Sequence, residues 1–290
     1  GYENKELNSF IPLKMDNAYF EKQYTPSYWT SKHSSRDACL EHYLKLSLHE
    51  SEVVRSKFQC ELNVQYGDSD REKVDYFFPD KVNINKILFV YIHGGFWYEG
   101  NKEMYSMIAK PFLQNGNAVA VVGYDLCPTV SIFEIKKQIL KAFDTIKSRF
   151  PEFELCIIGH SAGAYLAFAL AHESKMCIKG LVLISGVYDV THLIKTKMNE
   201  LLRIDDKSAQ ALNLYQCCDK LQTESILFFV GTDESEEFRR QTQEFCEHVS
   251  KFNSNVHICA FENEDHFSLI ENFSENQSKV VDQIYLTLKE

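Results

Sequence analysis

One serine, Ser161, stands between two glycines in the stretch Gly-His-Ser-Ala-Gly at 159–163. An apolar run precedes this cluster, and an alanine-rich segment with helical character follows it. A G-x-S-x-G cluster between a strand and a helix is typical of a nucleophile elbow, a sharp turn that holds its serine in a strained conformation. Gly159 and Gly163 would keep that turn from clashing with its neighbours. We therefore predict that Ser161 is a catalytic nucleophile and not an incidental residue of a tight connection.

A serine hydroxyl is a poor nucleophile until a base takes its proton, and the base needs an acid that fixes its tautomer. Asp233 follows the next-to-last predicted strand, and His266 lies just beyond the last one. The order Ser161, Asp233, His266 is the order of triad residues in proteins with this kind of elbow. Asp189 is a rival acid, because in some of these proteins the acid comes one strand earlier.

The stretch Tyr-Ile-His-Gly-Gly-Phe-Trp-Tyr-Glu-Gly at 91–100 supplies a glycine-rich loop after an early apolar strand. Such a loop contributes N–H groups to an oxyanion hole, together with the N–H of the residue after the nucleophile, here Ala162. We expect the backbone N–H groups of Gly95 and Phe96 to be the loop's donors to the oxyanion hole, and Gly94 to make the close turn possible. The aromatic residues Trp97 and Tyr98 could stack on an aryl leaving group or pack in the core.

Other histidines and acids occupy weaker positions. His93 lies inside the glycine-rich loop, which it is expected to orient by a hydrogen bond. The side chain of His160 is expected to point away from the elbow. Asp265 lies too close to His266 to orient it. The remaining residues are expected to serve structure or surface: His172 near the end of the elbow helix, His248, His257 and Asp125.

The elements around these residues alternate between strand and helix. Apolar runs predict strands at 86–95, 117–125, 154–161, 180–189, 225–233 and 256–263. Most lack in/out alternation, as expected for a sheet covered on both faces. Amphipathic stripes predict helices between them, one of which begins after Ser131 and ends before Pro151. The expected fold is α/β, with a mostly parallel, doubly wound sheet flanked by helices.

Two segments depart from that alternation. Residues 58–80 predict an antiparallel hairpin at one edge of the sheet. Residues 36–56 predict a helix, and about 190–222 predict a small helical cap over the sheet. No repeat or linker divides the chain, so we expect a single domain over 1–290.

Composition limits the partners. The chain has 290 residues and a formal net charge of -10, which argues against nucleic acid or an anionic membrane as the main partner. No apolar segment is long enough to span a membrane, and residues 1–20 lack the pattern of a secretory signal. Nine irregularly spaced cysteines, with Cys156 and Cys259 expected in interior strands, favour free thiols and a cytoplasmic location. The oligomeric state stays open, a homodimer included.

No metal-ligand spacing or nucleotide-binding motif is present, so neither a metal nor a cofactor is expected. The vicinal pair Cys217 and Cys218 has no second pair at a spacing suited to zinc.

Together, "HGGFWYEG", "GHSAGAYLA", "SGVYD", "VGTDES" and "EDHFSLI" resemble the α/β-hydrolase superfamily and, within it, the kynurenine formamidases (arylformamidases). Members of that family carry an H-G-G-x-W motif, matched here by His93, Gly94, Gly95 and Trp97. Related esterases of the hormone-sensitive-lipase type usually have a third glycine where this chain has Phe96. The stretch 21–29, "EKQYTPSYW", is a further match.

The resemblance implies hydrolysis of N-formyl-L-kynurenine to L-kynurenine and formate, a step of tryptophan catabolism in the kynurenine pathway. By analogy Ser161 would attack the formyl carbon and give a formyl-enzyme. His266 would pass the proton to the leaving aniline nitrogen, and Asp233 would stabilise the imidazolium. The alternatives are a broader carboxylesterase and a non-catalytic hydrolase fold that binds a partner.

Overall fold

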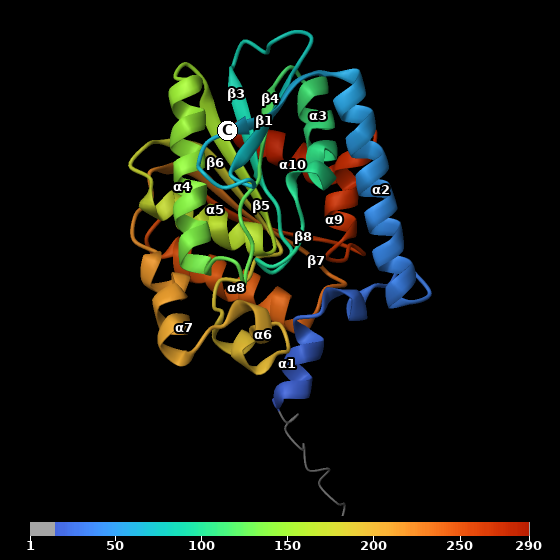
Figure 1. Cartoon of the computed structure of the whole chain (residues 1–290), viewed down its shortest axis with the longest axis vertical. Coiled ribbons are helices and arrows are strands. Elements are labelled where there is room, and N and C mark those ends of the chain that lie inside the picture. Colours follow the sequence, from blue (N-terminus) through green and yellow to red (C-terminus); the bar gives the residue numbers. More distant parts are fainter. Residues whose placement is uncertain (1–14, 290) are drawn as a thin grey trace, which may run out of the picture.

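The computed structural model describes residues 15–289, and its centre is an eight-stranded sheet in the order β1-β2-β4-β3-β5-β6-β7-β8 (Figure 1). Strands β3 to β8 pair in parallel, whereas β2 pairs antiparallel with both β1 and β4. The strand bounds are β1 Gln59–Gln65, β2 Lys73–Phe78, β3 Ile87–Ile92, β4 Ala118–Val122, β5 Glu154–His160, β6 Ile178–Ile184, β7 Thr223–Gly231 and β8 Val256–Phe261. The predicted mostly parallel, doubly wound sheet and its edge hairpin are confirmed.

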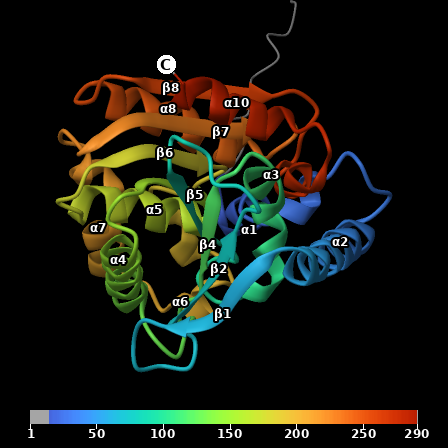
Figure 2. The same ribbon diagram turned by 90° about the horizontal axis from the view of Figure 1, so that it is seen from above.

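Helices cover both faces of the sheet, so two apolar cores form. One face carries α4 Ile132–Arg149, α5 Ala162–Glu173 and α8 Glu236–Ser250. The other carries α2 Arg36–Lys57, α3 Ala109–Gln114, α9 Ser268–Glu271 and α10 Lys279–Leu288, with the short 3₁₀ helices η2 Lys102–Ile108 and η5 Asn272–Ser274. Figure 2 shows α4 and α5 on one side of the central strands and α2 and α3 on the other.

Coverage on both faces explains why the central strands read as continuous apolar runs. Every residue of β3 and β4 is buried. The last strand differs, because β8 lies at the edge of the sheet and most of its side chains are exposed or half-buried. Cys156 is buried in β5 as expected, but Cys259 is only half-buried, which corrects its placement in an interior strand. All nine cysteines are free thiols.

Local signals set where helices begin. Ser131 caps α4 as predicted, since its hydroxyl accepts a hydrogen bond from the Glu134 N–H at 3.2 Å. Ser35 caps α2 in the same way through the Ala38 N–H. Within residues 15–289, no helix combines the length and apolar character needed to cross a bilayer. Most of residues 1–20, for which the sequence predicts no secretory signal, lie outside the described residues.

Two helical segments meet below the sheet in Figure 1. The predicted segment at 190–222 folds as η3 Thr191–Lys195, α6 Asn199–Leu202, α7 Asp206–Leu212 and η4 Leu214–Cys217. Beside it lies the N-terminal segment, formed by α1 Asn17–Gln23 and η1 Pro26–Trp29. Tyr24 anchors the N-terminal segment to α8, because its hydroxyl donates to Glu237 Oε2 at 2.7 Å and accepts from Gln241 Nε2 at 2.9 Å.

Candidate active site

Ser161 forms the turn between β5 and α5, with φ 57° and ψ -118°. A non-glycine residue in this region is strained, and such strain persists only where the surroundings enforce it. The two glycines enforce it by close packing. A Cβ on Gly159 would lie 2.2 Å from the Gly163 carbonyl oxygen, and one on Gly163 would lie 2.0 Å from the Ile92 carbonyl oxygen of β3. The predicted elbow is therefore present, with its glycines required by backbone contact.

The hydroxyl of Ser161 lies in a buried position at the wall of a cavity. The residue is 2% exposed, and its Oγ has no hydrogen-bond partner among the described residues. His266, 5% exposed, lines the same cavity. The Nε2 atom of His266 makes no hydrogen bond within the described part of the chain, which leaves it free to act on a substrate or on the serine. Catalytic hydrogen bonds are commonly long in unliganded sites and tighten only around the substrate.

The other ring nitrogen of His266 is held by Glu234. Nδ1 lies 2.6 Å from Glu234 Oε1, and the Glu234 side chain is almost fully buried. Glu234 Oε2 accepts two further hydrogen bonds, from the Ser185 hydroxyl at 2.6 Å and the Gly231 N–H at 2.7 Å. A buried carboxylate with three donors is well satisfied and fixed in place. It can orient the imidazole and stabilise its charged form.

The prediction that Asp233 is the acid partner of His266 disagrees with the geometry, because the carboxylate at His266 Nδ1 belongs to Glu234. The N–H of Asp233 donates to the Glu264 carbonyl at 3.0 Å, and its carboxylate accepts a hydrogen bond from the Ser31 hydroxyl instead of contacting His266. Asp233 and Glu234 are neighbours in the turn after β7, and their side chains point in different directions. The side chain of Glu234 is the one that faces His266. Asp189, the rival acid, is engaged locally by the N–H and hydroxyl of Thr191.

The glycine-rich loop after β3 turns through three successive left-handed residues: Gly95 (φ 114°), Phe96 (φ 47°) and Trp97 (φ 64°). The N–H groups of Gly95, Phe96 and Ala162 make no hydrogen bond within residues 15–289. Gly94 permits the approach of the loop to the elbow, since a Cβ there would lie 2.7 Å from the His160 carbonyl oxygen and 3.0 Å from Ser161 Cβ. These N–H groups are available to bind an oxyanion.

His93 holds this loop, as predicted. Its Nδ1 lies 2.7 Å from the Gly94 carbonyl oxygen, and its ring stacks on Tyr124 at a centroid distance of 4.4 Å. The Tyr124 hydroxyl donates to the His93 carbonyl at 2.6 Å. Burial lowers the pKa of His93 to about 4. A neutral imidazole therefore donates to the Gly94 carbonyl and does not act as a base.

His160 differs from the expectation that it would point away. Its ring lies 4.6 Å from that of His266, and its Nε2 lies 2.9 Å from the His266 carbonyl oxygen. Burial lowers the pKa of His160 well below its usual value. His160 thus supports the backbone that carries His266.

The other structural candidates lie where the sequence suggests. His172 is in the last turn of α5 and pairs with Asp219, and Asp125 is bound by Gln138. Asp265 accepts the N–H groups of Phe267 and Ser268 at the start of α9. His248 is half-buried and His257 is exposed.

The cavity beside Ser161 has a volume of about 550 Å³, within the range of small-molecule sites. Its wall is rich in aromatic residues, which are Tyr24, Tyr28, Tyr43, Phe96, Tyr98, Tyr105 and Phe267. Several of them belong to the N-terminal segment and α2, and Met198 and Leu201 come from the segment at 190–222. The sequence predicts the segment at 190–222 as a cap but assigns none of its residues to the site, and for the N-terminal segment the stretch 21–29 was the only signal.

The two residues predicted to stack on an aryl leaving group lie in different places. Tyr98 lines the cavity, but Trp97 is fully buried and packs edge-on against Tyr165 at 5.4 Å, away from the cavity wall. The assignment of Trp97 to substrate binding is therefore wrong, and its indole is part of the core. The left-handed turn at Phe96 and Trp97 directs the first ring toward the cavity and the second toward α5.

The family described as alpha/beta hydrolase fold matches residues 89–269, which include the elbow, the glycine-rich loop and His266. The chain belongs to this family. It is 29% identical over 269 residues to a kynurenine formamidase of Salmo salar, covering 89% of this chain and 91% of that protein. It is 27% identical to a kynurenine formamidase of Drosophila melanogaster, covering 90% and 94%.

A solved structure gives the same picture of the fold. A putative thioesterase from a Silicibacter species superposes with a TM-score of 0.77 at 27% identity and covers 94% of this chain and 99% of that one. The resemblance to kynurenine formamidases inferred from the motifs is thus confirmed over about nine-tenths of the sequence.

Proposed function

We propose that this chain is a serine hydrolase that cleaves N-formyl-L-kynurenine to L-kynurenine and formate. The observation that carries the proposal is the pair formed by the strained Ser161 elbow and the Glu234–His266 hydrogen bond, both facing a cavity rich in aromatic side chains. Similarity to kynurenine formamidases over most of the chain supports the choice of substrate.

In the first half of the reaction, Ser161 Oγ attacks the formyl carbon while His266 Nε2 takes its proton. The carbonyl oxygen becomes an oxyanion, which the N–H groups of Gly95, Phe96 and Ala162 stabilise. Glu234 stabilises the imidazolium. The C–N bond then breaks, and His266 gives its proton to the aniline nitrogen, leaving a formyl ester on Ser161.

In the second half, water attacks the formyl ester with His266 again as the base. The oxyanion collapses, Ser161 recovers its proton and formate leaves. No cofactor takes part in these steps. The side chain of Phe96, a residue of the oxyanion loop that is 6% exposed, lines the cavity and narrows the space for an acyl chain, which a formyl group does not need.

The test follows kynurenine formation by its absorbance with wild type and Ser161→Ala. Wild type is expected to turn over the substrate, and the variant to lose roughly 10⁴-fold or more in kcat. A fluorophosphonate probe should label wild type only. Inert wild type would contradict the proposal, and faster hydrolysis of aryl acetates or thioesters than of aryl formamides would favour a broader esterase.

A further inference from the structure

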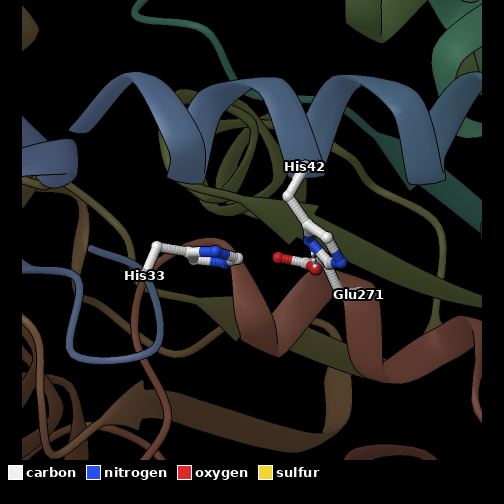
Figure 3. Close-up of side chains that lie close together, drawn as sticks. All are labelled: His33, His42 and Glu271. Carbon is white, nitrogen blue, oxygen red and sulfur yellow. Dashed lines mark ion pairs between the residues drawn. The ribbon is translucent and has the colours of Figure 1, made fainter. Parts of the chain in front are cut away.

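Three side chains from separate segments converge outside the catalytic cluster: His33 from the loop before α2, His42 from α2 and Glu271 from α9 (Figure 3). One ligand atom from each lies within 4.8 Å of those of the other two. His42 Nδ1 and Glu271 Oε2 are 2.7 Å apart, and the two imidazole rings are 4.9 Å apart. In Figure 3 the Glu271 carboxylate lies between the two rings.

The only permanent cation near the cluster among the described residues that acts on Glu271 is Lys32, whose charge favours the ionised carboxylate from a distance without forming an ion pair with it. Glu271 is 9% exposed, and within residues 15–289 no lysine or arginine pairs with it. A nearly buried carboxylate is costly unless a cation or donors satisfy it. Two imidazoles and one carboxylate are a ligand set that suits a borderline divalent ion such as Zn²⁺.

The spacing also suits zinc. Bonds of about 2.0–2.1 Å in a tetrahedral site place ligand atoms about 3.3 Å apart, so small side-chain rotations would complete the set. The ion would replace the proton between His42 and Glu271, and water would fill the fourth position. We propose that His33, His42 and Glu271 form a Zn²⁺ site.

The proposed zinc site lies where the loop before α2 contacts the catalytic turns. The hydroxyls of Thr30 and Ser31 donate to Asp265 and Asp233, so this segment already contacts the turns next to His266 and Glu234. Glu271 lies five residues after His266. Bound zinc would therefore fasten the N-terminal segment and α2, which line the cavity, to the segment that carries the catalytic histidine.

The test measures Zn²⁺ binding by calorimetry to wild type, His42→Ala and Glu271→Gln, with His49→Ala as the matched control because His49 is an exposed histidine on the same helix. Wild type and His49→Ala are expected to bind one equivalent, and the two site variants to bind at least roughly tenfold more weakly. Hydrogen exchange at 30–42 and 266–272 should slow on addition of zinc in wild type.

Free cysteines are the competing ligands, so Co²⁺ spectra decide between them. Imidazole and carboxylate ligands give visible bands without the near-ultraviolet absorption of a cobalt–thiolate bond. Absence of binding by wild type, undiminished binding by both site variants, or a thiolate spectrum would overturn the proposal.

The rim of the catalytic cavity carries a second, independent feature. Arg36 lines the cavity, its Nε donates to the Ser27 hydroxyl at 3.0 Å, and its guanidinium lies 3.7 Å from the Tyr28 ring centroid. No carboxylate pairs with it among the described residues, so both terminal amino groups are free. Glu99 also lines the cavity without a basic partner in this part of the chain, and burial raises its pKa.

This arrangement suits a substrate with both charges of an α-amino acid. We infer that Arg36 binds the substrate carboxylate, since a fixed guanidinium binds carboxylates through two hydrogen bonds. Glu99 would bind the α-ammonium group. This inference rests on the proposed function and names the side chains that select an amino-acid formamide over a neutral one.

The measurement is the ratio of kcat/KM for N-formyl-L-kynurenine to that for formanilide, which has neither charge. Arg36→Gln is expected to lower this ratio about tenfold or more, and Arg36→Lys less. Lys195→Gln changes a cation that packs over the Phe20 ring and does not line the cavity, and it should leave the ratio unchanged. An unchanged ratio in Arg36→Gln would overturn the subsite alone, whereas wild type that cleaves neither formamide would contradict the proposed function.

Discussion

Gly163 and Ile92 are in backbone contact: a Cβ on the glycine would lie 2.0 Å from the Ile92 carbonyl oxygen. This contact joins the helix after the nucleophile to the strand before the oxyanion loop. The two halves of the site are therefore placed by one close approach between main chains, which only a residue without a side chain allows.

Gly163→Ala is expected to destabilise the protein by about 3 kcal/mol or more, because neither backbone can move without disturbing the sheet. Urea unfolding measures the change. Gly180→Ala is the control, since its Cβ would meet the end of a flexible side chain, Leu288 Cδ2, at 2.7 Å. Equal stability of both variants would show that the contact does not constrain the elbow.

Phe96→Gly is expected to widen acyl specificity. Phe96 lines the cavity at a positive φ of 47°, so glycine relieves backbone strain while it removes the ring. The ratio of kcat/KM for a butyryl anilide to that for the formyl anilide should rise roughly tenfold or more. An unchanged ratio in a folded variant would mean that another group limits the acyl space.

Stability is expected to fall as the pH drops from 7 to 5. The pKa of His93 is about 4 in the folded chain because of burial, and about 6.5 in the unfolded chain. The unfolded state alone takes up a proton in this window, so stability present above 6.5 is lost as the pH falls toward 4. His93 alone accounts for about 2 kcal/mol at pH 5.

Urea unfolding at pH 7 and pH 5 tests this. His93→Asn keeps a donor near the Gly94 carbonyl and should lose less stability between the two values than wild type. His257→Asn, at an exposed histidine, should behave as wild type. The same loss in wild type and His93→Asn would assign the effect to other groups, of which His160 is the first candidate, because burial depresses its pKa in the same direction.

Patterns that extend over many residues predicted the fold correctly. The apolar runs found every parallel strand, and the elbow cluster found Ser161 with its strand and helix. Burial of single strands was harder to predict, because the edge position of β8 depends on the order of strands in the sheet.

The site was less predictable where its geometry depends on which of two adjacent residues faces the histidine. Asp233 and Glu234 are adjacent carboxylates in one turn, and the sequence does not say which faces His266. Glu234 could have been named as a candidate acid beside Asp233, because either aspartate or glutamate can complete such a triad. His33 and His42 are nine residues apart, but Glu271 lies more than 200 residues further along the chain, so no local spacing revealed the cluster.

The central claim is that Ser161, His266 and Glu234 act together. The most direct measurement is kcat/KM for N-formyl-L-kynurenine in Glu234→Gln and in Asp233→Asn, two changes that each remove one charge from the same turn. The expected result for Glu234→Gln is a loss of about 10⁴-fold in kcat/KM that comes from kcat, by analogy with amide replacement of a triad carboxylate, and little change is expected for Asp233→Asn. The reverse order, with Asp233→Asn inactive and Glu234→Gln active, would contradict the account.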